Sequence, residues 1–278
     1  MDDLNTLNKK LFPYAYNILG NIGDCQDVIQ EVLIKFNEKE GCSISNPNAY
    51  LIKSVINQAI NLKKKNDRER QQKITLPEPI VTNQGESKIE LDEILNYSML
   101  VLLDTLNTKE RAVLLLKEAF DYEHGDIAEI LEISAENSRQ ILTRAKKKLK
   151  LRKPEIATSS AKDRKYLEKY VSAIRKGDVK TLEQILSDEV QVLADAGNKL
   201  QAIAELTSGI DNTIKLMTYV YENHQKDLEI KIEEINHQSA LLFYRGTILI
   251  NCQIFELNPD GKITSIFSVV DPEKLMKI

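Results

Sequence analysis

The sequence predicts a multidomain protein in which two all-α domains are followed by an α+β domain with a curved antiparallel sheet. Three observations support this fold class. Apolar residues recur at helical spacing up to about residue 153. After about residue 188, short apolar runs such as EVQVLAD, SALLFYRG and KITSIFSVVD alternate with turn residues, as strands do. Chain-breaking residues separate these parts, so we divide the chain into residues 1–75, 76–95, 96–153 and 154–278.

The composition excludes several classes of protein. Hydrophobic residues make up 42% of the 278-residue chain, which is enough for packed cores. Cys25, Cys42 and Cys252 are widely spaced and include no C-x-x-C pair, so we expect reduced thiols and no metal or cofactor. No apolar run approaches the roughly 18 residues of a membrane span, and no secretory signal is present. We therefore expect a cytoplasmic protein without membrane contact.

Positive charge is concentrated locally, although the chain as a whole carries a net charge of −4. Residues 1–75 hold 11 basic and 9 acidic side chains, and residues 96–153 hold the same numbers, whereas residues 76–95 and 154–278 are both acidic. Eight Lys or Arg and no acid lie between Arg139 and Lys153. Because such clusters bind phosphate locally, the net charge does not exclude a nucleic-acid partner.

The first helix of functional interest is predicted from about Asp24 to Asn37. Its buried face repeats apolar residues at helical spacing: Cys25, Val28, Ile29, Val32, Leu33 and Phe36. On another face, Ile34 lies among the carboxylates Asp24, Asp27, Glu31 and Glu38. This pattern fits either a solvated acidic face or a surface that docks on another protein.

A second helix is predicted to begin with Asn46 as its N-cap and Pro47 in its first turn. One side is apolar, and the other carries amide and cationic side chains at helical spacing: Lys53, Asn57, Asn61, Lys64 and Arg68. Together with the adjacent Lys63 and Lys65, we call these residues the polar stripe. Amides bond base edges and cations neutralise phosphate, so this polar stripe suits DNA. A solvated, lysine-rich helix end is the alternative.

Residues from Glu123 to Lys150 have the spacing of a helix-turn-helix motif, with Ser134 as the cap of the second helix. The outer face of that second helix is predicted to contact DNA, and it comprises Ser134, Glu136, Asn137, Arg139, Gln140, Thr143, Arg144 and Lys147. Glu132 occupies the turn position that glycine usually holds, so a left-handed backbone there would cost about 1 kcal/mol. A helical hairpin with a solvated basic end is the alternative.

Residues 5–152 contain three ordered segments: LFPYAYNILGNIGDCQDVIQEVLIKF, NPNAYLIKSVINQAINLKKKNDRER and LDTLNTKERAVLLLKEAFDYEHGDIAEILEISAENSRQILTRAKKKL. Together they resemble regions 2 and 4 of an extracytoplasmic-function sigma factor of the sigma-70 family. LPEPI, from Leu76 to Ile80, resembles the linker motif of the subgroup with a fused C-terminal SnoaL-like domain. The segment from Asp195 to Lys199 and the run VVDPEKL resemble two motifs of that domain.

The resemblance implies a non-enzymatic sigma factor that binds promoter DNA and core RNA polymerase, the latter through its clamp helices and flap. The acidic face would dock on polymerase through Asp24, Asp27, Gln30, Glu31 and Ile34. The polar stripe around Asn57 would contact the −10 element, and the helix after Ser134 would read the −35 element. A regulatory loop is implied at Asp195, Ala196, Gly197, Asn198 and Lys199, with intramolecular contacts between the SnoaL-like domain and the sigma domains.

Two other functions stay open from the residues alone. One is a helix-turn-helix regulator that acts without core polymerase. The other is a SnoaL-type enzyme or ligand sensor with a DNA-binding front end, for which Asp195 and His224 are the candidate acid–base groups, although they form no paired constellation. In the C-terminal domain, helices are predicted for residues 161–177, 179–186 and 200–208 ahead of the strands.

Overall fold

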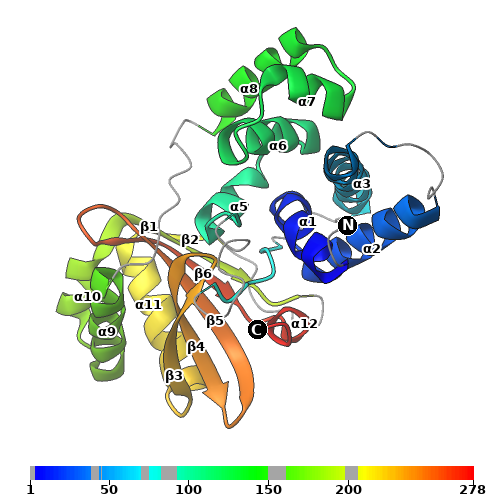
Figure 1. Cartoon of the computed structure of the whole chain (residues 1–278). Coiled ribbons are helices and arrows are strands. Elements are labelled where there is room, and N and C mark those ends of the chain that lie inside the picture. Colours follow the sequence, from blue (N-terminus) through cyan, green and yellow to red (C-terminus); the bar gives the residue numbers. More distant parts are fainter. Residues whose placement is uncertain are drawn as a thin grey trace. The chain divides into compact units, whose positions relative to one another are not determined.

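Figure 1 shows a computed structural model of the chain, which describes residues 4–38, 44, 46–69, 75–82, 93–149, 161–197 and 206–278. The chain forms two compact units. The helical unit comprises Met1–Gln71, Glu86–Leu95 and Met99–Glu155, and the sheet unit comprises Gln72–Gly85, Asn96–Ser98 and Ile156–Ile278. Among the helices of the described residues, none is long and apolar enough to cross a membrane.

Three helices open the helical unit: α1 (Leu4–Leu19), α2 (Ile22–Glu38) and α3 (Pro47–Glu69). Asn46 begins α3, because its Oδ1 accepts a hydrogen bond from the main-chain nitrogen of Ala49 at 3.1 Å, which confirms the predicted cap. The apolar face of α2 is buried as predicted, except that Leu33 is only half-buried. The spacing of apolar residues therefore determines which face of each helix enters the core.

The next helix, α5 (Tyr97–Leu103), belongs to the helical unit from Met99 onward. The helical unit then continues with α6 (Thr108–Leu114), a π-helical turn η1 (Leu115–Ala119), α7 (His124–Leu131) and α8 (Ala135–Lys148). α7 and α8 form the predicted helix-turn-helix, and Ile141, Leu142 and Ala145 are buried on the inner face of α8. Glu132 ends α7 with a left-handed backbone, at φ 53°. The turn thus has the left-handed conformation that favours glycine, although the residue is glutamate.

In the sheet unit, some helices precede the first strand in the sequence and others follow it. Its helices are α9 (Ala161–Lys176), α10 (Val179–Ile185), α11 (Ile210–Val220), the π-helical turn η2 (Tyr221–Gln225) and α12 (Pro272–Leu275). Its strands are β1 (Leu186–Asp195), β2 (Thr207–Ser208), β3 (Glu229–Ile235), β4 (Gln238–Arg245), β5 (Ile248–Leu257) and β6 (Ile263–Val269). The predicted fold class, helical domains followed by an α+β domain, is confirmed.

The six strands form one sheet in the order β2-β1-β6-β5-β4-β3. All neighbouring pairs are antiparallel except β1 and β6, which run parallel. β3 is an edge strand. The helix predicted for residues 200–208 is wrong at Thr207 and Ser208, which pair with β1 as β2; residues 200–205 lie outside the described part of the chain.

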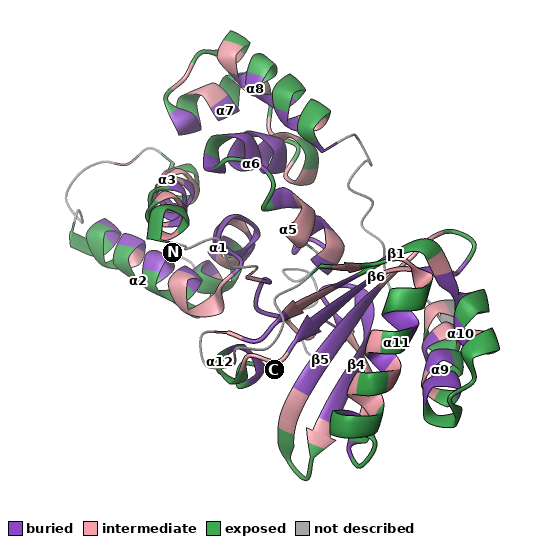
Figure 2. Cartoon of the chain, turned by 180° about the vertical axis from the view of Figure 1, so that it is seen from behind, coloured by how far each residue is buried: buried purple, intermediate pink, exposed green. Residues whose placement is uncertain are grey.

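One face of the sheet is covered by α9, α10 and α11, whose outer surfaces are exposed while the strands are largely buried (Figure 2). Leu167 and Tyr170 of α9 and Met217 of α11 pack with Leu241 and Phe255 of the sheet in a single core. This apolar layer holds α9 against the sheet, with the edge strand β3 alongside it.

Candidate nucleic-acid interface

The outer face of α8 presents polar groups to solvent. Ser134 begins the helix, because its Oγ accepts a hydrogen bond from the main-chain nitrogen of Asn137 at 3.1 Å, which confirms the predicted cap. Asn137 is half-buried, and the other predicted contact residues are exposed: Ser134, Glu136, Arg139, Gln140, Thr143, Arg144 and Lys147. The donors and acceptors that base edges and phosphates require are thus accessible on this helix.

The contacts within the outer face are weak and local. Arg139 Nη1 lies 3.5 Å from Glu136 Oε2, and Gln140 Nε2 donates to Glu136 Oε1 at 3.3 Å. Arg144 Nε donates to the carbonyl oxygen of Gln140 at 3.4 Å. Exposed contacts between neighbouring turns contribute well under about 1 kcal/mol each, so DNA can replace them at little cost.

A contact beneath the outer face joins the two helices of the motif. His124 Nδ1, at the start of α7, lies 2.8 Å from Oγ of Ser138, which is fully buried in α8. The residue before His124 is Glu123, which accepts a hydrogen bond from Lys117 Nζ. This bond holds the pKa of the Glu123 carboxyl below its usual value. The sequence pattern did not identify His124 in this role, because an isolated histidine has no spacing signal.

Two of the three consecutive lysines of α8 form ion pairs with carboxylates of the described residues, and the middle one does not. Lys146 Nζ lies 2.6 Å from Glu118, and Lys148 Nζ lies 2.7 Å from the buried carboxylate of Glu110. These ion pairs anchor the C-terminal end of α8 on η1 and α6. Lys147 projects from the exposed side and forms no ion pair with the described residues, which leaves it for a phosphate.

The polar stripe of α3 divides into an exposed part and an engaged part. Asn61, Lys65 and Arg68 are exposed, and Lys53 and Lys64 are half-buried. Asn57 and Lys63 differ from them. Asn57 Nδ2 donates a hydrogen bond to the carbonyl oxygen of Ile130 at 2.9 Å, and Lys63 retains only 5% of its surface exposed. The helix-turn-helix segment therefore contacts the stripe directly.

Lys63 is buried in an ion-pair cluster that the sequence did not predict. Its Nζ lies 3.0 Å from Asp104 Oδ1 and 3.3 Å from Asp67 Oδ1. Arg111 Nη1 contacts the same Asp104 oxygen at 2.6 Å. Because Asp104 precedes α6 and Lys63 lies in α3, this cluster fastens the stripe to the start of the following helical segment.

The Arg111 guanidinium is the largest fully buried side chain among the described residues. Its Nε donates to the carbonyl oxygen of Asn17 at 2.9 Å. The Asn17 amide in turn donates to the carbonyl oxygen of Glu93 at 2.8 Å and accepts from the main-chain nitrogen of Leu95 at 3.0 Å. A buried guanidinium with these partners positions α1 and α6 within one core.

The acidic face of α2 carries an exposed apolar residue, as predicted. Ile34 is 50% exposed, and Asp27, Gln30 and Glu31 are exposed around it. Asp24 is half-buried and accepts a hydrogen bond from Asn66 Nδ2 of α3 at 2.9 Å. Glu31 also forms an ion pair with Lys35 one turn further along α2, so Ile34 lies among charges of both signs, and the docking role of this face stays a prediction.

In the sheet unit, the predicted linker is held by an ion pair that we call the linker clamp, formed by Asp195 and Lys274. Asp195 Oδ2 accepts a hydrogen bond from the main-chain nitrogen of Leu76 at 2.8 Å and lies 2.7 Å from Lys274 Nζ. Lys274 Nζ also donates to the carbonyl oxygen of Leu76. Both main-chain groups of Leu76 are therefore bound, and Asp195 is only 3% exposed.

The loop that the family resemblance predicts to be regulatory begins at the linker clamp. Gly197 adopts φ 66°, and its main-chain nitrogen donates to Asp195 Oδ1 at 2.9 Å. A Cβ at Gly197 would lie 2.6 Å from the carboxyl group of Asp271, so a side chain does not fit there. Ala196 is buried, and the predicted loop residues Asn198 and Lys199 lie outside the described part of the chain.

The linker continues along the turn between β3 and β4. Asn236 binds Ile80 twice: its Oδ1 accepts from the Ile80 nitrogen at 2.9 Å, and its own main-chain nitrogen donates to the Ile80 oxygen at 2.8 Å. The main-chain nitrogen of Thr82 donates to the oxygen of Glu234 at 3.2 Å. Leu76–Pro79 are buried. The linker thus packs as an added segment of the sheet unit.

The two candidate acid–base residues lie in different elements, Asp195 at the end of β1 and His224 in η2. Both carboxylate oxygens of Asp195 accept hydrogen bonds in the linker clamp and the loop that follows it. His224 lies in η2, where its ring stands edge-on to that of Tyr219 with 6.2 Å between centroids. Asp195 therefore has a structural role in holding the linker.

Comparisons with known proteins agree with these features. Residues 98–149 match the family described as Sigma-70, region 4. The chain is 22% identical to the ECF RNA polymerase sigma factor SigJ of Mycobacterium tuberculosis, over 99% of the chain and 92% of SigJ. It is 24% identical to a probable ECF RNA polymerase sigma factor, SigI, of the same organism, over 95% and 91% of the two chains. The crystal structure of SigJ aligns with a TM-score of 0.77 and 18% identity, over 98% of this chain and 96% of that one.

Proposed function

We propose that this chain, a homologue of the ECF RNA polymerase sigma factors, binds core RNA polymerase and directs promoter-specific initiation of transcription. The observation that carries the proposal is the exposed outer face of α8, capped by Ser134 within a helix-turn-helix. The chain is similar to SigJ along nearly its whole length, which supports this function for the helical unit and the sheet unit together.

In this proposal α8 reads the −35 element. Arg139 and Gln140 lie exposed in the first turns of the helix, where side chains of a recognition helix meet base edges in the major groove. Arg144 and Lys147 lie one to two turns further along, where they would neutralise phosphates. The bases fix the sequence preference and the phosphates fix the position of the helix on DNA.

The polar stripe of α3 contacts the −10 element. No covalent chemistry is needed to open DNA there, because bases that leave the stack are captured by binding energy. Asn57 supplies an amide for a base edge, and Lys64, Lys65 and Arg68 supply charge for the backbone. With no tryptophan in the chain, Tyr50, half-buried at the start of α3, is the aromatic side chain available for stacking.

Engaging the −10 element requires the helical unit to rearrange locally. Asn57 is bonded to Ile130 and Lys63 to Asp104, so these two members of the stripe exchange their partners before they reach DNA. The outer face of α8 has no such obstacle. We infer that the free chain is closed at the −10 side and that docking of α2 on core polymerase, through Ile34 and its acidic surroundings, accompanies opening.

Regulation in cis follows from the linker clamp. Leu76 is bound at both main-chain groups by Asp195 and Lys274, and Ile80 is bound at both by Asn236. A linker held in this way has less freedom to reposition the segments that it joins. The sheet unit would therefore set how far the −10 and −35 contact surfaces can separate.

The experiment that tests the proposed function is complex formation with purified core polymerase. We expect the chain to co-elute with core on size exclusion, and Ile34→Glu to weaken the complex because it places another acid in an exposed apolar docking position. Tyr219→Glu, an equally exposed site in the sheet unit, is the matched control. Promoter binding without any association with core would instead assign the chain to helix-turn-helix regulators.

A further inference from the structure

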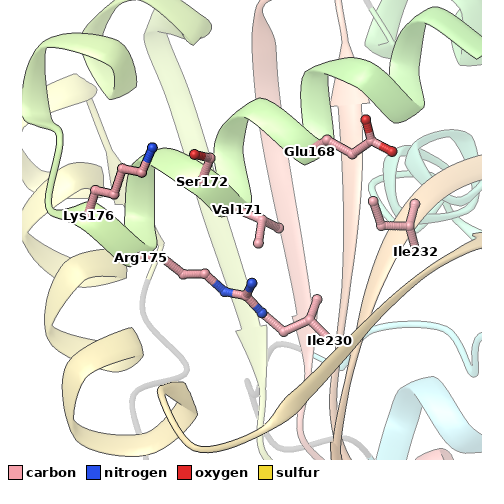
Figure 3. Close-up of a pocket in the computed structure, with 7 residues that line it drawn as sticks. All are labelled: Glu168, Val171, Ser172, Arg175, Lys176, Ile230 and Ile232. Atoms are coloured by element: carbon pink, nitrogen blue, oxygen red, sulfur yellow. The ribbon is translucent and has the colours of Figure 1, made fainter.

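A groove in the sheet unit lies between α9 and the edge strand β3. It has a volume of about 420 Å³ and is lined by Val171, Ile230 and Ile232 as its apolar floor, with Glu168, Ser172, Arg175 and Lys176 around it. In Figure 3 Arg175 reaches from α9 toward Ile230, and Glu168 lies near Ile232 at the other end. The groove therefore runs along the strand edge and has an apolar centre between charged ends.

The main chain of β3 is oriented to pair with a further strand beside this groove. In an antiparallel ladder, alternate residues direct both main-chain groups to the same side. The oxygen of Glu234 accepts from Thr82, and the nitrogen of Asn236 donates to Ile80, both on the side away from β4. With no bulge in the β3–β4 register, Ile232 and Ile230 direct their main-chain groups to that same side.

The linker shows that this edge accepts an antiparallel segment. Val81 forms an antiparallel bridge with Ile235, and its neighbours supply the hydrogen bonds to Glu234 and Asn236. The described part of the linker ends at Thr82, before Ile232. The groove lies beside Ile230 and Ile232, the part of β3 that precedes Glu234 and Ile235, where the described linker residues pair.

The charged side chains of the groove determine which side chains a bound strand would carry there. Glu168 is offset by Arg164, whose Nε lies 3.6 Å away. Arg175 and Lys176 are exposed and form no ion pair with the described residues. The uncompensated charge is therefore positive and lies beside the apolar floor, which suits a carboxylate next to an apolar residue.

We propose that the β3 edge beside α9 binds an extended peptide of a partner protein as an added antiparallel strand. Main-chain bonds to Ile230 and Ile232 provide affinity, as in other complexes formed by strand addition. Alternate side chains of the peptide enter the groove, apolar ones over Val171 and acidic ones near Arg175 and Lys176. This inference goes beyond the proposed function, because it requires neither DNA nor polymerase.

The test uses the full chain and a fluorescein-labelled nonapeptide in which every second residue is valine in one half and glutamate in the other, with threonine between them, so that one face of the strand carries both side-chain types. We expect saturable binding by fluorescence anisotropy, weakened roughly tenfold by the double substitution Arg175→Glu and Lys176→Glu. The matched control is Lys180→Glu with Lys215→Glu, which makes the same charge change at exposed sites outside the groove. Equal loss of affinity in the two double variants would overturn the proposal.

Two further measurements separate strand addition from other modes of binding. The peptide should slow amide hydrogen exchange at Ile230 and Ile232, and its analogue with N-methyl groups at alternate residues should lose at least about tenfold in affinity. An N-methylated analogue that binds equally well would overturn strand addition. The proposal also fails if the chain binds the peptide only after residues 83–87 are replaced by Gly and Ser, since its own linker would then be the occupant.

Discussion

Asn57 Nδ2 donates a hydrogen bond to the carbonyl oxygen of Ile130 across 2.9 Å, which joins α3 to the last turn of α7. The amide that we propose for the −10 element is therefore occupied by the segment that precedes the −35 recognition helix. Six residues along α3, Lys63 is buried against Asp104. Together these contacts define a closed arrangement of the helical unit, and each of them makes a measurable prediction.

The substitution Lys63→Met tests the ion-pair cluster. We expect it to lower the free energy of unfolding by about 1–2 kcal/mol, because Lys63 is buried while Asp67 and Asp104 remain partly exposed. Lys65→Met, an exposed position on the same helix, should change it by less than about 0.5 kcal/mol. Urea denaturation measures both, and equal effects would contradict a structural role for Lys63.

The linker clamp is tested by Asp195→Asn, which leaves the Lys274 ammonium buried without a carboxylate. We expect a loss of about 3 kcal/mol in stability and faster amide exchange at Leu76. Asp188→Asn, at an exposed position of the same strand, serves as the control. In a double-mutant cycle with Lys274→Met, the two effects should be strongly non-additive; simple additivity would show that the pair does not act together.

The left-handed turn of the helix-turn-helix predicts a stabilising substitution. Glu132 adopts φ 53°, which costs a residue with a Cβ about 1 kcal/mol, so Glu132→Gly should raise the free energy of unfolding by up to that amount. Glu129→Gly, at an exposed position inside α7, should lower it by a similar amount. Opposite signs in thermal denaturation are expected, and destabilisation by both would exclude strain at Glu132.

The outer face of α8 makes separate predictions for base and phosphate contacts. Arg139→Ala should cost about 1–3 kcal/mol in binding to the preferred −35 sequence and should relax the preference at one position. Lys147→Ala should weaken binding to all sequences similarly and reduce the slope of log affinity against log salt by about 1. Titrations of duplex libraries at several salt concentrations measure both, and a uniform effect of Arg139→Ala would remove it from base reading.

The core of the sheet unit predicts a pH-dependent effect at Tyr170. Its hydroxyl is buried without a hydrogen-bond partner among the described residues, so Tyr170→Phe should stabilise the protein by about 1 kcal/mol at pH 7. Burial also raises the pKa of Tyr170, so the folded hydroxyl stays protonated when the unfolded one ionises near pH 10. Stability of the unsubstituted chain should therefore fall above pH 10, and the advantage of Tyr170→Phe should grow.

Tyr97→Phe is the control for that measurement. The Tyr97 hydroxyl donates to the carbonyl oxygen of Pro77 at 2.7 Å, so its removal leaves a buried acceptor unpaired. We expect a loss of stability of about 1 kcal/mol, the reverse of the effect at Tyr170. Denaturation curves at pH 7 and pH 10.5 distinguish the two, and a stabilising Tyr97→Phe would contradict the assigned hydrogen bonding.

Local features of the fold could be predicted from the sequence because their causes lie within a few residues. Asn46 and Ser134 each cap the helix that follows, through bonds to main-chain nitrogens three residues ahead. The helix-turn-helix could be predicted from the spacing between the apolar faces of its two helices. These signals need no knowledge of distant contacts, so the pattern alone carries them.

The partners of the engaged residues of the polar stripe could not be predicted in this way. Lys63 follows Ile56 and Ala59 at helical spacing and so lies on the buried face of α3, but the spacing does not indicate which carboxylate its ammonium meets. Its partner Asp104 is 41 positions away, and Ile130 is 73 positions from Asn57. Periodicity reports which face is apolar but not which polar residues meet across the fold.

For Lys274, the sequence indicates the residue but not its partners. The run VVDPEKL that contains it resembles a family motif, yet nothing in its spacing indicates that the Lys274 ammonium meets Asp195, 79 positions earlier, and Leu76 of the linker. A motif therefore located the residue, and only the three-dimensional structure identified its partner. The same holds for Gly197, whose close approach to Asp271 explains the glycine.

The measurement that tests the central claim most directly is abortive initiation by core RNA polymerase in the presence of the purified chain. Promoter templates selected by binding to the chain–core complex should yield short transcripts from one start position, and core alone should yield none from that position. Arg139→Ala should reduce initiation from the selected template more than from one with an altered −35 element. Failure of the full chain to form a complex with core and to initiate on any selected template would contradict the account.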